Sequence, residues 1–259
     1  QRKPGDSAIS ASRSLQVNGG ARHPPAEYPQ FAARSVAHYG DVGLSAHAGQ
    51  KMAYSGAPVD DAGVSHDYEY ERIQRTIDLT GHAAGSLSFW EVHHLRTNFE
   101  AVIVEAHTPG KDDWTTLPDV GGRTSDRTAL SCGSAQWYAL FPQLAHYMTR
   151  TGEGNMATCT PQGTTGGWNA LGGTTNEWQP VTVDLSAWAG KSVEVAITYV
   201  RSRRNPQVNT FVIVDDIVVK VDDQVVDTAT FEDGEGGWAF TGLPAGAPIE
   251  DPSVNFTIA

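Results

Sequence analysis

The sequence lacks both a long apolar run and an excess of positive charge, and each absence removes a class of function. No stretch of about 18 consecutive apolar residues occurs, so we expect no membrane span. The 18 Lys and Arg residues are outnumbered by 30 Asp and Glu residues, which gives a formal net charge of −12. Such an acidic chain offers no broad electrostatic surface to nucleic acid or to an anionic membrane. We therefore expect neither as a partner, whereas the acidic surface suits cation binding.

The sequence also lacks the short motifs that identify common hydrolases. HExxH and GxSxG are both absent. His66 and Glu69 have the spacing of a carboxypeptidase zinc pair, but they lie in a turn-like polar stretch and are best explained as solvated loop residues. Ser45 and His47 have no strand–turn–helix context around them. We expect no catalytic zinc, and a hydrolytic triad is unsupported.

Cysteine is scarce, with only Cys132 and Cys159 in the chain. Their spacing matches neither a zinc knuckle nor a redox pair, so we predict a disulfide between them. Closing that loop would remove roughly 3–4 kcal/mol of unfolded-state entropy in the chain-entropy model. A disulfide implies an oxidising compartment, and hence secretion. The alternative is two free buried cysteines. The opening Gln1 is followed by no apolar signal core, so we expect a mature or trimmed product.

What the chain does contain is a succession of short strand-like runs. In residues 72–79, Ile73, Ile77 and Leu79 fall on one face and polar residues on the other, as in a half-buried strand. Almost no helical periodicity accompanies these runs, so we predict an all-β fold, an antiparallel β-sandwich of jelly-roll type. Further strands are expected at 51–55, 87–92, 99–106, 181–185, 193–200 and 211–219, with a hairpin at 218–226.

Composition divides the chain into one main domain with appendages. Residues 1–46 are rich in Ser, Gly and Pro and are expected to form an N-terminal arm or linker. Residues 47–227 form the sandwich, interrupted by a long disulfide-tied insertion at 118–180 that is rich in Gly, Thr and Trp. Residues 228–259 are expected to be a tail or to add partial extra strands.

Two adjacent carboxylates, Asp215 and Asp216, lie within a hydrophobic strand. Such groups are costly to bury unless they are paired or bound to a cation, so we predict a structural calcium site there. Asp60 and Asp61 supply further oxygens if the early loop folds back onto this strand. The alternative is a salt bridge to one of the arginines Arg72, Arg75, Arg201, Arg203 and Arg204.

Histidines and aromatics give two further candidates. Because adjacent residues on a strand face opposite sides, His93 and His94 are not expected to share one metal ion, and we predict one packed and one exposed imidazole. Trp137, Tyr138 and Trp168 lie in the long insertion and form a candidate platform for stacking on a sugar or peptide. The alternative is that these rings pack in the core or anchor loops.

Three strings occur in the order found in a known family, namely FEAVIVEAHTPGKDDWTTLP at 99–118, VDLSAWAGKSVEVAITY at 183–199 and FVIVDDIVV at 211–219. They resemble the C-terminal accessory sandwich, jelly-roll and MAM-like, of secreted actinobacterial zinc carboxypeptidases and of immune inhibitor A-like metallopeptidases. FEDGEGGW at 231–238 resembles the segment that follows this sandwich. The resemblance covers roughly residues 47–245.

Relatives of this kind carry a zinc-binding catalytic domain ahead of the sandwich, and nothing of that size precedes residue 50 here. The resemblance therefore implies a secreted, non-catalytic accessory module, with calcium, and does not carry over peptidase activity. Such a module supports folding, recruits a protein or glycan substrate of a parent peptidase, or attaches to a surface. Two alternatives remain: a secreted hydrolase whose site the sequence does not reveal, and a structural protein that assembles through its arm and insertion.

Overall fold

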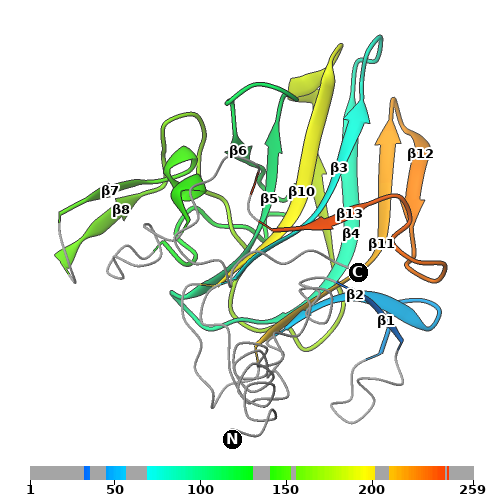
Figure 1. Ribbon diagram of the computed structural model, residues 1–259, viewed down its shortest axis with the longest axis horizontal. Coiled ribbons are helices and arrows are strands. Elements are labelled where there is room, and N and C mark those ends of the chain that lie inside the picture. The colour runs from blue at the N-terminus through cyan, green and yellow to red at the C-terminus, as the bar shows by residue number, and fades with distance from the viewer. Residues whose placement is uncertain are drawn as a thin grey trace, which may run out of the picture.

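The computed structural model describes residues 32–35, 45–56, 69–130, 141–152, 156–201, 210–242 and 244, with the backbone alone described at 32–35. Within these residues, two antiparallel sheets face one another in a β-sandwich, as the strand periodicity predicts (Figure 1). None of the helical segments described is long and apolar enough to span a membrane.

The first sheet has six strands, ordered β1-β2-β11-β4-β9, with β12 also pairing to β11. Their bounds are β1 Ala32–Ser35, β2 Lys51–Gly56, β4 Gly85–His94, β9 Gln179–Asp184, β11 Phe211–Val221 and β12 Gln224–Ala229. The second sheet has five strands, ordered β13-β3-β10-β5-β6. Their bounds are β3 Glu69–Asp78, β5 Glu100–His107, β6 Thr115–Thr116, β10 Ser192–Arg201 and β13 Ala239–Thr241.

The main core lies between the sheets and follows the period of two in each strand. In β4, Leu87 and Phe89 point into it, whereas Trp90 and Val92 belong to the opposite face. In β3, Ile73 and Ile77 also belong to the core, as the alternation in residues 72–79 predicts. In these two strands, alternate side chains therefore face the core.

The five-stranded sheet has a second apolar layer on its outer face. All eight residues of β5 are buried, because residues of the predicted insertion cover the side that faces away from the main core. This second layer includes Ile103 from β5 together with Phe141, Leu144 and Trp168 from the insertion. Near-continuous apolar runs such as 101–104 are typical of strands that are buried on both faces.

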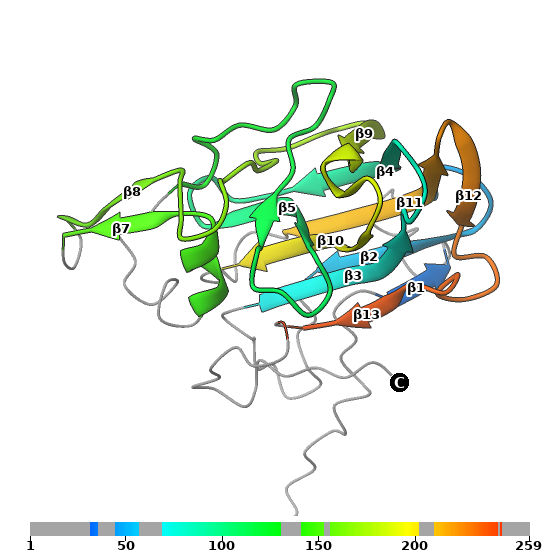
Figure 2. The same ribbon diagram turned by 90° about the horizontal axis from the view of Figure 1, so that it is seen from above.

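The insertion contains regular structure of its own, where we expected irregular chain. Two short strands, β7 Thr149–Thr151 and β8 Thr158–Thr160, form a hairpin, and a 3₁₀ turn, η3, spans Pro142–His146. Figures 1 and 2 both show this hairpin at one side of the sandwich, with β12 at the opposite side. Cys159 lies on β8, half-buried, with its Sγ 3.4 Å from Sδ of Met148. Cys132 lies outside the described residues, so the disulfide stays a prediction.

The predicted final hairpin turns at the expected residues. Asp222 and Asp223 connect β11 to β12 with φ angles of 47° and 65°, which a tight two-residue turn between antiparallel strands requires. After it, β13 pairs with β3 and adds a short strand to the edge of the second sheet. Partial extra strands after residue 228 are therefore present, at least at 239–241.

Candidate functional site

Asp215 and Asp216 lie where β11 bulges away from regular pairing with β4. The Asp215 side chain is fully buried on the outer face of the six-stranded sheet. It accepts hydrogen bonds from the backbone N–H groups of His47 at 3.0 Å, Ala48 at 3.4 Å and Asp216 at 2.8 Å. Asp216 has a φ of 47°, and its Oδ2 lies 2.6 Å from Nδ1 of His47. The two carboxylates therefore fix the segment 45–50 onto the sheet.

The arginines Arg72 and Arg75, our alternative partners for these carboxylates, are engaged elsewhere. Arg72 pairs with Glu105 and Glu194, and Arg75 pairs with Asp227. For these two arginines the alternative is wrong, because each pairs with another carboxylate, and Arg203 and Arg204 lie outside the described residues.

Of the four predicted calcium ligands, the structure describes Asp215 and Asp216. Asp60 and Asp61 lie outside the described residues. Among the residues described, no three His, Cys, Asp or Glu side chains converge as a metal site. Calcium at Asp215 and Asp216 thus stays a prediction that metal analysis of the folded protein can test.

Burial raises the pKa of Asp215 to about 6, from an ordinary value of 3.8. Between these values the folded protein binds more protons than the unfolded chain, so this group's contribution to the free energy of unfolding falls as pH rises. We expect the stability of Asp215→Asn relative to the parent protein to increase between about pH 4 and pH 6 and then to level off. Urea unfolding of both proteins across this range measures the difference, and a difference independent of pH would contradict the assignment.

The same outer face carries a first group of aromatic rings around His47. The His47 imidazole stacks on Trp90 with a centroid distance of 4.1 Å and an interplanar angle of 15°. The Trp178 ring meets His47 edge-on at 5.6 Å, and its Nε1–H donates to the Ser45 carbonyl at 3.1 Å. All three rings are half-buried. A flat ring surface therefore lies beside the carboxylates.

A second group of rings continues along this face. Phe211 of β11 lies opposite His94 of β4, and their ring centroids are 6.1 Å apart in a T-shaped arrangement. Tyr54 of β2 stacks with Phe211 at 6.4 Å and 20°. These three rings are half-buried too, and together with the first group they border the apolar side chains of Met52, Val92 and Ile213. We call these six rings the aromatic face; they are His47, Tyr54, Trp90, His94, Trp178 and Phe211.

Of the three residues in the aromatic platform expected in the insertion, only Trp168 lies within the described residues. Trp168 is only 1% exposed, packs in the second apolar layer and donates from Nε1 to the Thr128 carbonyl at 2.7 Å. Its ring therefore presents no surface for stacking, and the alternative of core packing is correct for this residue. Trp137 and Tyr138 lie outside the described residues.

The two adjacent histidines face opposite sides, as predicted. His93 is buried, with Nδ1 2.6 Å from Oε2 of Glu91, whereas His94 belongs to the aromatic face. Glu91 also pairs with Arg123, which reaches it from the insertion. Glu91 and His93 are buried and Arg123 is partly exposed, and together they link β4 to the segment that follows β6. His66 and the side chain of Glu69 lie outside the described residues.

Sequence reasoning missed a buried carboxylate at Glu105. Its Oε1 accepts hydrogen bonds from the hydroxyls of Tyr70 and Tyr147, and its Oε2 accepts from Thr198 at 2.6 Å and from Nε of Arg72 at 3.2 Å. Burial, followed by the charge of Glu105, raises the pKa of both tyrosines. These donors come from β3, β10 and the insertion, so Glu105 joins the insertion to the outer face of the five-stranded sheet.

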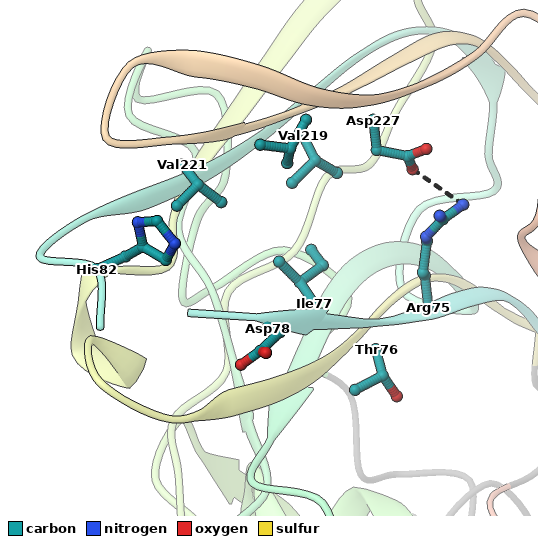
Figure 3. A pocket seen from close by; sticks show the side chains of 9 residues that line it. Arg75, Thr76, Ile77, Asp78, His82, Val219, Val221 and Asp227 are labelled. Atoms are coloured by element: carbon teal, nitrogen blue, oxygen red, sulfur yellow. Dashed lines mark ion pairs between the residues drawn. The ribbon is translucent and has the colours of Figure 1, made fainter. Parts of the chain in front are cut away.

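A separate groove opens at the side of the sandwich, between β3 and the β11–β12 hairpin (Figure 3). Its cavity volume is about 180 Å³. Ile77, Val219 and Val221 form its apolar lining, and the Arg75–Asp227 ion pair, 3.0 Å long, lies at one end. The remaining lining residues are Thr76, Asp78, His82 and Val226.

Comparison with known proteins identifies no family for this chain. No protein-family model matches the chain, and no curated protein matches it either. Among solved structures, the chain is similar to TmCBM61, determined in complex with beta-1,4-galactotriose. The TM-score is 0.35 and the identity 8%, and the match covers 74% of this chain and 83% of that one.

Proposed function

We propose that this chain is a non-catalytic extracellular recognition module, of the kind that accompanies secreted metallopeptidases, and that it recruits a glycan through the aromatic face. The observation that carries the proposal is the pair of half-buried ring groups on the outer face of the six-stranded sheet. Secretion and the Cys132–Cys159 disulfide are part of the proposal, and comparing the protein's mass before and after thiol alkylation under non-reducing conditions tests the disulfide.

The chemistry of this face suits a sugar better than a purely apolar ligand. Binding sites for small ligands combine apolar and aromatic surface with a few polar groups that fix orientation. Here Tyr54 and the part of the Trp90 ring that His47 does not cover provide apolar surface. His47 and Asp216 lie beside each other here. The ring nitrogens of His47 and the carboxylate oxygens of Asp216 can hydrogen-bond to hydroxyls. A pyranose offers both an apolar C–H face and a rim of hydroxyls.

The test is calorimetric titration with oligosaccharides derived from cell-wall glycan, chitin and cellulose, with a collagen-like peptide for comparison. For the oligosaccharide that binds best, we expect Trp90→Ala to lower the affinity roughly 30-fold, which corresponds to about 2 kcal/mol for loss of a central aromatic contact. Tyr54→Phe retains the ring and is the matched control, so its affinity should stay close to that of the parent protein.

Two results would overturn the proposal. One is that none of the oligosaccharides binds. The other is that Trp90→Ala, with an unfolding transition as cooperative as that of the parent, binds with unchanged affinity.

A further inference from the structure

Within the described part of the chain, β12 is an edge strand whose second side is unpaired. Among the described strands it pairs with β11 alone, from Ile217 opposite Ala229 to Val221 opposite Gln224. Figure 2 shows it at the border of the sandwich, on the side away from the β7–β8 hairpin. An edge of this kind presents backbone N–H and C=O groups that can pair with another extended chain.

The side chains of β12 do little to discourage such pairing. Val225 and Val226 are each 56% exposed, although natural edge strands usually carry lysine, proline or inward-facing charge. β12 does have one protective device, a register shift opposite Val219 and Lys220 that twists its pairing with β11. Two exposed valines next to each other on an edge are a surface that favours contact with a partner.

The side groove runs alongside this strand. Val226 and Asp227 of β12 line it together with β3 and β11 residues, so a chain added to β12 would lie beside the groove (Figure 3). At about 180 Å³ the groove is smaller than the roughly 300–1,000 Å³ typical of small-molecule sites. Its size suits a single side chain instead, which would meet the edges of Ile77, Val219 and Val221 and the polar residues that line the rest of the groove.

Carboxylates outnumber cationic side chains around the groove, although Lys220 of β11 lies opposite Val225 of β12. Asp78 lines it, and the turn residues Asp222 and Asp223 lie at the end of β12. Arg75 is already paired with Asp227, and His82 has its Nδ1 2.8 Å from Oδ2 of Asp222. No lysine is among the lining residues. Charge complementarity therefore favours a basic partner.

We propose that β12 and the side groove bind an extended, basic segment of a partner protein. The segment adds as a strand to the free edge of β12, places one aliphatic side chain in the groove, and sets a lysine or arginine against Asp78, Asp222 or Asp223. In strand addition of this kind, main-chain hydrogen bonds give affinity and the pocket for an alternate side chain gives specificity. This site lies apart from the aromatic face and does not depend on glycan binding.

A capped peptide of alternating lysine and valine is the probe, titrated into the intact chain and followed by fluorescence polarisation. We expect Val226→Lys to weaken binding at least about tenfold, because it adds positive charge and fills the groove mouth. Val120→Lys is the matched control, since Val120 is 69% exposed on a different part of the surface and should leave affinity unchanged. A peptide whose backbone nitrogens are methylated on the edge that faces β12 should not bind, because it cannot donate the main-chain hydrogen bonds.

The proposal fails if the N-methylated peptide binds as well as the unmodified one, if Val226→Lys and Val120→Lys bind equally, or if the unmodified peptide does not bind. Sedimentation velocity over a range of concentrations tests whether a second copy of the chain occupies this edge. A parent protein that dimerises while Val226→Lys stays monomeric would assign the edge to a second copy of the chain and overturn the proposal. Thermal unfolding of each variant confirms that it is folded.

Discussion

Replacing Glu105 by alanine is expected to lower the free energy of unfolding by about 3–5 kcal/mol, the range seen when one member of a buried ion pair is removed. The reason is the number of donors that Glu105 satisfies. Its loss removes the buried carboxylate beside the Arg72 guanidinium, which keeps the partly exposed Glu194 and the Trp114 ring as neighbours. It also leaves the hydroxyls of Tyr70 and Tyr147 without their acceptor. Since small domains are stable by only about 5–15 kcal/mol, this change alone removes a large part of the total.

Glu194→Ala is the matched control. Glu194 pairs with Arg72 and with His107, but its side chain is 24% exposed, so water can replace these interactions. We expect a loss of at most about 1 kcal/mol for this variant. Urea unfolding, monitored by tryptophan fluorescence, measures the free energy of unfolding of both variants. Equal losses for Glu105→Ala and Glu194→Ala would contradict the view that the buried carboxylate holds the insertion on the sheet.

Replacing Trp168 by alanine is expected to cost about 3–5 kcal/mol of stability, as for other large side chains removed from a core. The ring is buried in the second apolar layer, and its N–H is satisfied by the Thr128 carbonyl. Removing it leaves both a cavity and an unpaired carbonyl. The Trp90→Ala variant, which removes a half-buried ring from the aromatic face, should cost clearly less stability.

This pair of tryptophans separates two accounts of the protein. If the insertion were the binding platform, Trp168→Ala would lose ligand and keep its stability. If the aromatic face binds, Trp90→Ala loses ligand and Trp168→Ala loses stability. Chemical denaturation combined with calorimetric titration of the two variants distinguishes these outcomes, and a stable Trp168→Ala protein would count against the fold described for the insertion.

Strand content and core could be predicted because they depend on local periodicity. The alternation in residues 72–79 places Ile73 and Ile77 in the core, and the structure confirms both. The same alternation in β4 also indicates which residues share the aromatic face. Trp90, Val92 and His94 share the side opposite Leu87 and Phe89, so this strand has apolar residues on both faces.

The contacts that define the sites could not be predicted, because they join distant parts of the chain. Asp215 and its donor His47 are separated by 168 positions, and no local pattern relates them. Trp168 lies in a segment rich in Gly and Thr, where no period tells a buried ring from an exposed one. Glu105 sits in an apolar run whose outer face is buried only because the insertion covers it.

The central claim is that ligand binds on the aromatic face, and the most direct measurement is the ¹⁵N–¹H spectrum of the tryptophan indoles during titration with the oligosaccharide that binds best. The chain has seven tryptophans, so each indole resonance can be assigned by substitution. The account predicts that the resonances of Trp90 and Trp178 move while those of the buried Trp168 and Trp238 stay fixed. Movement of Trp137 alone, with Trp90 and Trp178 unchanged at saturation, would contradict it.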